Sequence, residues 1–161
     1  MAVTAKSTET KVVTGKVRFS YVNVFEPRAV EEGQEPKYSV SILIPKTDKT
    51  TLAKIERAIE AAKQQGLSMW GGKMPANLKL PLRDGDTDRP DDPAYRGHYF
   101  INATSKIKPG VVDAQLNPII DPTEFYSGCY GRASINFFPF NKAGNRGVAA
   151  GLNNLQKLAD G

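Results

Sequence analysis

The feature that most constrains the fold is a run of strict alternation near the end of the chain. From Cys129 to Phe138, small or apolar side chains occupy every second position, and tyrosine, arginine, serine, asparagine and phenylalanine occupy the positions between them. A period of two places neighbouring side chains on opposite faces of a β-strand, whereas an amphipathic helix repeats at about 3.6 residues. We therefore expect a strand over residues 126–138. Its Cys129 and Phe137 should face the core, and its Tyr130 and Phe138 should face outward.

Four other segments also have the composition or the alternation of β-strands. They are residues 11–25, 37–44, 99–108 and 147–158. In the first of these segments, Gly15 marks an expected bulge or bend. In the last, the alternation breaks between Leu152 and Leu155, which predicts a bulge there as well.

One helix is expected, over residues 50–65, where apolar side chains recur at steps of three and four. Asp48 or Thr50 is suited to cap its start, and Gly66 stands where a left-handed residue commonly ends a helix. Residues 66–97 form a long irregular stretch, of a kind that is functional or partly mobile.

Five strands with one intervening helix predict a mainly β chain, most simply an OB-fold-like five-stranded barrel with long loops. The 14 glycines and 11 prolines are spread along the chain, which suits many turns better than a helical bundle. We expect a flexible N-terminus over residues 1–10 and a single domain over residues 11–161, because 161 residues suffice for one sizeable core.

Charge and cysteine content exclude several classes of protein. The chain has 22 basic and 17 acidic residues, a net charge of +5, which makes a polyanionic partner plausible without requiring one. Its one cysteine cannot form an internal disulfide and fits a reducing cytosol. No apolar run approaches the length of a membrane span, and the first residues lack the layout of a secretion signal.

The outward faces of three expected strands combine aromatic and basic residues and carry no carboxylate. Rings of this kind stack on unpaired bases while lysine and arginine neutralise phosphates, which is what single-stranded nucleic acid requires. The alternative is that Phe100 and Phe138 are buried under loops or the helix and that the lysines are merely solvated. The candidate DNA-binding residues are Lys16, Arg18, Phe100, Lys106, Lys108, Tyr130, Arg132, Phe138 and Arg146.

An acidic stretch invites a metal-site interpretation, because Asp84, Asp86 and Asp88 occupy the first three ligand positions of a calcium-binding loop. The sixth position is Arg89 instead of glycine and the twelfth is Tyr95 instead of glutamate, so the motif fails at both diagnostic places. A solvated loop is favoured, with its acids paired to arginines. Those arginines would be Arg83, Arg89 or Arg96. We expect neither a metal nor a cofactor.

Several motifs together resemble one family, the bacteriophage and prophage single-stranded DNA-binding proteins. The motifs are Tyr38-Ser-Val-Ser-Ile-Leu-Ile-Pro-Lys46, Pro81-Leu-Arg-Asp-Gly-Asp86, Gly97-His-Tyr-Phe-Ile-Asn-Ala103, residues 126–138 and residues 144–155. The resemblance covers nearly the whole chain. It implies an OB-fold core, no catalysis, and a role in phage replication or recombination in the cytoplasm of the infected bacterial host.

The predicted function is therefore largely sequence-independent binding of single-stranded DNA by a non-enzymatic protein. Further copies of the chain along the DNA and phage replication proteins are additional expected partners, and a membrane is not. Two other classes stay open at this point. One is a metal-dependent nuclease that uses the acidic loop of residues 84–92, and the other is a phage structural or adaptor β-barrel that binds protein.

Overall fold

The computed structural model describes residues 10–29, 33–142 and 145–161. The expected flexible N-terminus falls outside the described residues except for Thr10. The main elements, in chain order, are β1 (Lys11–Val13), β2 (Val17–Arg28), β3 (Lys37–Pro45), α2 (Lys49–Gly66), η1 (Ser68–Trp70), β4 (Arg83–Asp84), α3 (Gly85–Asp88), η2 (Pro93–Tyr95), β5 (His98–Ser105), β6 (Gly110–Val112), η3 (Pro122–Glu124), β7 (Tyr130–Lys142) and β8 (Asn145–Ala159).

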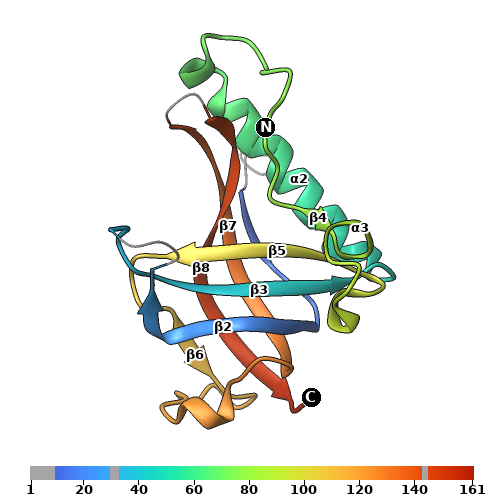
Figure 1. Ribbon diagram of the computed structural model, residues 1–161, viewed down its shortest axis with the longest axis vertical. Coiled ribbons are helices and arrows are strands. Elements are labelled where there is room, and N and C mark those ends of the chain that lie inside the picture. The colour runs from blue at the N-terminus through green and yellow to red at the C-terminus, as the bar shows by residue number, and fades with distance from the viewer. Residues whose placement is uncertain (1–9, 30–32, 143–144) are drawn as a thin grey trace, which may run out of the picture.

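Five strands close into a barrel, in the order β7, β2, β3, β5 and β8, with β8 pairing back onto β7. All of these pairs are antiparallel except β5 with β8, which is parallel. Three short strands are added at the edges of the barrel strands. β1 pairs with β7, β6 with β8, and β4 with β5. The OB-fold-like five-stranded barrel predicted from the sequence is therefore confirmed (Figure 1).

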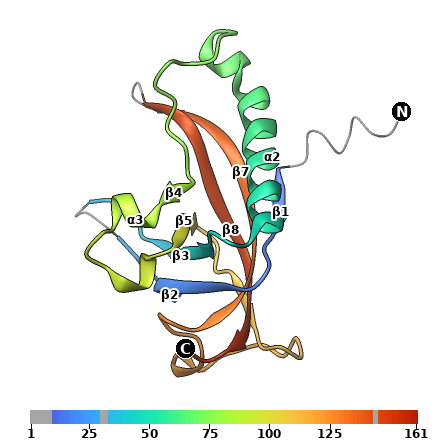
Figure 2. The ribbon, with the colours of Figure 1, turned by 90° about the vertical axis from the view of Figure 1, so that its right-hand side faces the viewer.

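The helix α2 lies alongside the long β7–β8 hairpin, where the two strands extend beyond the barrel (Figure 2). Its apolar stripe enters the same core as the strands, with Ile55 wholly buried and Ile59 nearly so. No helix among the described residues is long and apolar enough to cross a membrane.

The ends of α2 differ in how well they were predicted. Asp48 caps the start as expected, because its side chain accepts a hydrogen bond from the Thr51 backbone N–H at 3.1 Å. The expected left-handed residue at Gly66 is wrong, since Gly66 is the last helical residue. A Cβ at this glycine would come within 2.8 Å of Trp70 and Pro139, so close packing explains the glycine. The left-handed glycine comes five residues later, at Gly71.

The expected single strand over residues 11–25 is divided into β1 and β2. Thr14 is buried, and its hydroxyl accepts a hydrogen bond from the Ala133 N–H. The next N–H, that of Gly15, donates to the Thr51 hydroxyl of α2 at 2.9 Å. These two bonds turn the chain from the hairpin onto the barrel, so Gly15 marks a bend between two strands.

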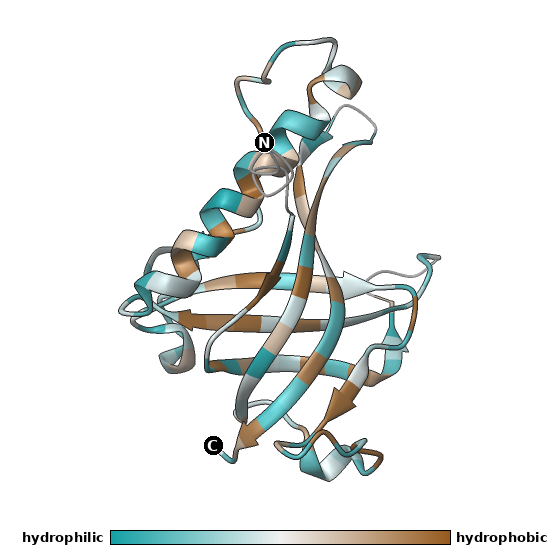
Figure 3. Ribbon diagram, turned by 180° about the vertical axis from the view of Figure 1, so that it is seen from behind, coloured by the Kyte–Doolittle hydropathy of each residue, from teal (hydrophilic) through white to brown (hydrophobic). Residues whose placement is uncertain are grey.

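The side-chain parity predicted for β7 is confirmed. Hydrophilic and hydrophobic residues alternate along the strands (Figure 3). Cys129 and Phe137 are almost fully buried, whereas Phe138 is 40% exposed. The bulge predicted in β8 is also present, because Ser134 pairs with Asn154 while its neighbour Ile135 pairs with Leu152.

Candidate nucleic-acid interface

One row of residues crosses the barrel on the side turned away from the core. Leu43 of β3 lies directly opposite Arg18 on β2 and Phe100 on β5. Directly opposed residues in antiparallel strands share a face, so these side chains point the same way. The row is extended by Tyr130 opposite Arg18 and by Arg83 opposite Phe100. We call this side of β2, β3 and β5 the outer face.

The following rows of the outer face are polar and uncharged until the far end of the strands. Ser20, Ser41 and Asn102 form one row, and Asn23, Ser39 and Thr104 form the next. Arg28 pairs with Lys37 beyond them. None of these paired positions carries a carboxylate, so the outer face has cations at both ends and neutral hydrogen-bonding groups between them.

A hollow of about 440 Å³ lies at the end marked by Arg28 and Lys37. It brings together the ends of three barrel strands and one residue from the β7–β8 hairpin. Its lining residues are Arg28, Gln34, Glu35, Lys37, Ser39, Thr104, Lys106 and Lys142. The one carboxylate among them, Glu35, lies 3.8 Å from the Lys106 ammonium in an exposed pair. Four cations against one acid give this hollow a positive potential suited to phosphate.

The opposite end of the outer face holds a cluster formed by Lys16, Arg18 and Tyr130. The Lys16 ammonium and the Arg18 guanidinium lie 5.3 and 5.4 Å from the centre of the Tyr130 ring, as in cation–π contacts. Arg18 also donates from Nε to the Gly128 carbonyl at 3.1 Å. That bond fixes the side chain while leaving the other guanidinium donors available to a phosphate. The sequence analysis placed Lys16 and Arg18 on one strand face and Tyr130 on another, and the structure brings the three side chains together.

Phe100 is a correction to the predicted site, because it is completely buried. Its ring lies 5.0 Å from that of Tyr95 in a T-shaped contact, and Leu43 completes this small second cluster. Arg83 and Arg89 lie over the ring at 5.5 and 5.6 Å. The segment containing α3 and η2 thus covers one end of the outer face, and the alternative interpretation, burial beneath a loop, holds for Phe100.

Ion pairs hold this covering segment in place. The Lys46 ammonium lies 2.8 Å from carboxylate oxygens of both Asp84 and Asp86, and Arg83 donates to Asp88 at 2.9 Å. The expected pairing of the acids with arginines is thus right for Asp88, while Asp84 and Asp86 use a lysine. Lys46 directly follows β3. Since β3 pairs with β5 and β5 pairs with β4, the lysine lies near the acids of β4 and α3. Among the residues described by the structure, no three metal-ligating side chains converge.

These pairs predict a pH dependence that is confined to the covering segment. Hydrogen bonds from Lys46 lower the pKa of both Asp84 and Asp86. Carboxylates with a lowered pKa stabilise the fold above the unfolded value of about 3.9, and this stabilisation is lost as the pH falls through the lowered values. We expect the amide proton of Gly97, which donates to Asp86 at 3.1 Å, to shift in NMR spectra below about pH 3.9. Asp86→Asn should abolish the shift, and an unchanged shift in that variant would contradict the assignment.

The remaining predicted residues lie outside the two clusters of cations. The Lys108 ammonium lies 5.9 Å from the centre of the Phe25 ring, and Arg146 is an exposed residue at the start of β8. Arg132 donates to the Thr14 carbonyl at 2.9 Å and Phe138 lies further along the hairpin. With a rise of about 3.3 Å per residue, Phe138 is roughly 26 Å from Tyr130, so the two rings cannot stack on adjacent bases.

Sequence reasoning missed three residues of the outer face, namely Tyr21, Arg28 and Lys37. Tyr21 is 55% exposed, has a left-handed backbone with φ of 48°, and its ring centre lies 6.4 Å from that of Tyr95. No alternation could place it, because the pairing of β2 with β3 shifts between Ser20 and Asn23. Lys37 did carry a signal, since it stands on the polar side of an alternating strand.

A family described as Enterobacter phage Enc34, ssDNA-binding protein, matches residues 10–161 of the chain. The chain belongs to this family. This membership confirms the resemblance that the motifs indicated.

Two proteins illustrate what the chain is similar to. The single-stranded DNA-binding protein from bacteriophage Enc34, solved in complex with ssDNA, is 29% identical with a TM-score of 0.83, over 94% of this chain and 88% of that one. Protein p50 of Acyrthosiphon pisum secondary endosymbiont phage 1 is also 29% identical, over 94% of this chain and 84% of the relative.

The similarity of fold extends further than the Enc34 family. The single-stranded DNA-binding protein gp2.5 of bacteriophage T7 has a TM-score of 0.66 at 16% identity, over 95% of this chain and 88% of that one. At this identity the match concerns the fold alone.

Proposed function

We propose that this protein binds single-stranded DNA with little sequence preference and organises or protects it during phage replication or recombination inside the infected bacterial cell. The observation that carries the proposal is the outer face, which is free of carboxylates at its paired positions and has cations at both ends. Membership of the Enc34 family and the Enc34 protein's solved complex with ssDNA support it.

The binding mechanism follows from the chemistry of the two ends. Phosphates are held by Lys16 and Arg18 at one end and by Arg28, Lys37 and Lys106 at the other, which releases counterions and makes affinity depend on salt. Tyr130 and Tyr21 offer rings on which bases can stack, and stacking tolerates any base. Between the ends, Ser41 is buried and accepts a hydrogen bond from the Tyr95 hydroxyl at 2.8 Å, so it is closed to DNA. The exposed side chains of Asn102 and Thr104 offer hydrogen bonds without charge.

The proposal also holds that the protein is not an enzyme. Asp84 and Asp86 share the Lys46 ammonium and Asp88 pairs with Arg83, so each of these three acids already has a cationic partner. A gel shift with single- and double-stranded oligonucleotides, with and without Mg²⁺, tests the proposal. We expect a shift of the single strand that does not need Mg²⁺ and weaker binding of the duplex. If neither the single-stranded nor the double-stranded oligonucleotide shifted, the result would favour the alternative of an adaptor β-barrel that binds protein.

Changing Asp84, Asp86 and Asp88 together to asparagine tests the nuclease alternative directly. We expect the affinity for single-stranded DNA to stay equal or to rise slightly, because three negative charges near a polyanion are removed. The measurement is a binding titration beside an assay for cleavage in Mg²⁺. Cleavage by the natural chain that the triple variant lacks would make the protein an enzyme and overturn the proposal.

A further inference from the structure

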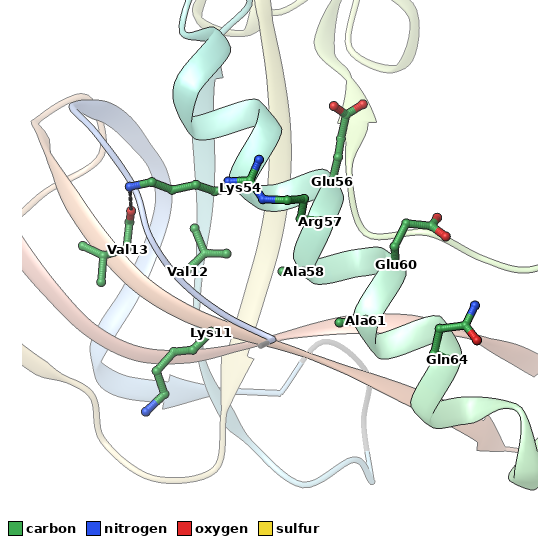
Figure 4. A pocket seen from close by; sticks show the side chains of 10 residues that line it. All are labelled: Lys11, Val12, Val13, Lys54, Glu56, Arg57, Ala58, Glu60, Ala61 and Gln64. Atoms are coloured by element: carbon green, nitrogen blue, oxygen red, sulfur yellow. Dashed lines mark hydrogen bonds between the residues drawn. The ribbon is translucent and has the colours of Figure 1, made fainter. Parts of the chain in front are cut away.

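A second groove, of about 880 Å³, lies between α2 and the free edge of β1. Its floor contains Val12, Ala58 and Ala61, and basic side chains stand along it (Figure 4). Lys54 and Arg57 reach from α2 toward β1 (Figure 4). Glu56 and Glu60 also line the groove, but their carboxylates point away from β1 (Figure 4).

The backbone of β1 adds polar groups to this groove. The Thr10 carbonyl accepts a hydrogen bond from Phe137 and the Thr14 N–H donates to Ala133, so these residues face β7. Alternate residues of a strand direct their backbone groups to opposite sides, and Lys11 and Val13 therefore face the groove. Backbone N–H groups are common donors to phosphate oxygens.

Basic side chains lie between this groove and the proposed DNA interface, on both sides of the Asp48 carboxylate, which would lie 3.0 Å from a Cβ at Gly15. The Val13 carbonyl accepts a hydrogen bond from the Lys54 ammonium at 3.4 Å. The next carbonyl, that of Thr14, accepts one from the Arg132 Nε at 2.9 Å. Two residues further on, Lys16 lies over Tyr130. Three residues span at most about 10 Å, so the positive track that begins at the outer face continues into the groove.

We propose, on the basis of the function proposed above, that a long single strand of DNA leaves the outer face at Tyr130 and continues into the groove between β1 and α2. Lys54 and Arg57 bind its phosphates there, and the apolar floor accommodates base or sugar. Strand addition by a peptide is disfavoured, because the Lys54 ammonium already occupies the Val13 carbonyl that an added strand would use.

The test compares two lengths of single-stranded oligonucleotide. One has about 6 nucleotides, within the range that one OB fold covers, and the other about 20. The double variant Lys54→Gln and Arg57→Gln should bind the short one as the natural protein does. For the long one, the slope of log affinity against log salt should become shallower by about 1.4, which is roughly 25-fold weaker binding at 0.1 M salt.

The matched control is the double variant Lys49→Gln and Lys73→Gln, which removes the same charge at positions outside the groove lining. It should bind both oligonucleotides like the natural protein. Equal losses for the two lengths, or no loss for the long one, would overturn the proposal. If the natural protein bound neither length, the proposed function itself would have failed, which is a different result.

A second measurement locates the DNA directly. Cys129 is completely buried, so a cysteine introduced as Gln64→Cys in the groove is the accessible thiol for a photo-crosslinker. We expect it to crosslink the 20-nucleotide strand and not the 6-nucleotide one, while Ser68→Cys crosslinks neither. Loss of binding to a Glu-rich 20-residue peptide in the Lys54/Arg57 variant, with DNA affinity unchanged, would assign the groove to an acidic protein segment and overturn the proposal.

Discussion

Replacing Arg28, Lys37 and Lys106 together by glutamine is expected to lower the affinity for single-stranded DNA about 100-fold at 0.1 M salt. The three side chains line one hollow at the end of the outer face. Each phosphate contact contributes about 0.7 to the slope of log affinity against log salt, so the slope should become shallower by roughly 2. Fluorescence anisotropy titrations at several salt concentrations measure both quantities.

The control for this prediction replaces three lysines elsewhere, namely Lys49, Lys63 and Lys73. The change in net charge is the same, but none of these residues lines the hollow. Long-range attraction alone would lower the affinity equally in both triple variants. Such equality would show that the hollow does not hold phosphates and that the outer face is not the interface.

The second large effect concerns stability, because Phe137→Ala should lower the free energy of unfolding by about 3–5 kcal/mol. Phe137 is 1% exposed and belongs to the main core, so its truncation leaves a cavity in that core. Chemical denaturation followed by circular dichroism measures the change. The variant that remains folded should bind single-stranded DNA with unchanged affinity.

Its neighbour Phe138 provides the matched control, since the same substitution occurs one position along the same strand. Phe138 is 40% exposed, and its truncation should cost less than about 1 kcal/mol of stability. If a base stacks on the Phe138 ring, the same variant should also lose about 1–3 kcal/mol of binding free energy for single-stranded DNA. The slope of log affinity against log salt should then change little. Unfolding by Phe138→Ala, with Phe137→Ala well folded, would show that the faces of β7 are assigned the wrong way round.

Several features of the protein could be predicted because they depend on neighbours in the chain. The alternation of β7 fixes which side chains share a face, since successive residues of a strand point to opposite sides. The Asp48 cap also involves a residue only three positions away, and the bulge in β8 follows from a break in the local pattern. Lys16, Arg18 and Tyr130 were placed on outward faces by the same local reasoning.

What local pattern could not show is which outward face stays open. Phe100 has the alternation of an outward residue, and it does point away from the barrel core. It is buried because Tyr95, five positions earlier, folds over it from a segment held by Lys46, which is about forty residues distant in the chain. Burial on the outward face of a strand depends on such a distant segment. The alternation of side chains along the strand itself carries no information about it.

The hollow beside Arg28 and Lys37 is likewise formed by residues that are far apart in the chain. Its residues come from β2, β3, β5 and the β7–β8 hairpin, and they meet only through the pairing register of the closed barrel. The sequence by itself determined the five main strands, apart from the division at Gly15, together with the helix, the parity of side chains and the family. Only the tertiary structure decided which cations converge and which aromatic ring is covered, because register and loop packing join residues that no local interaction connects.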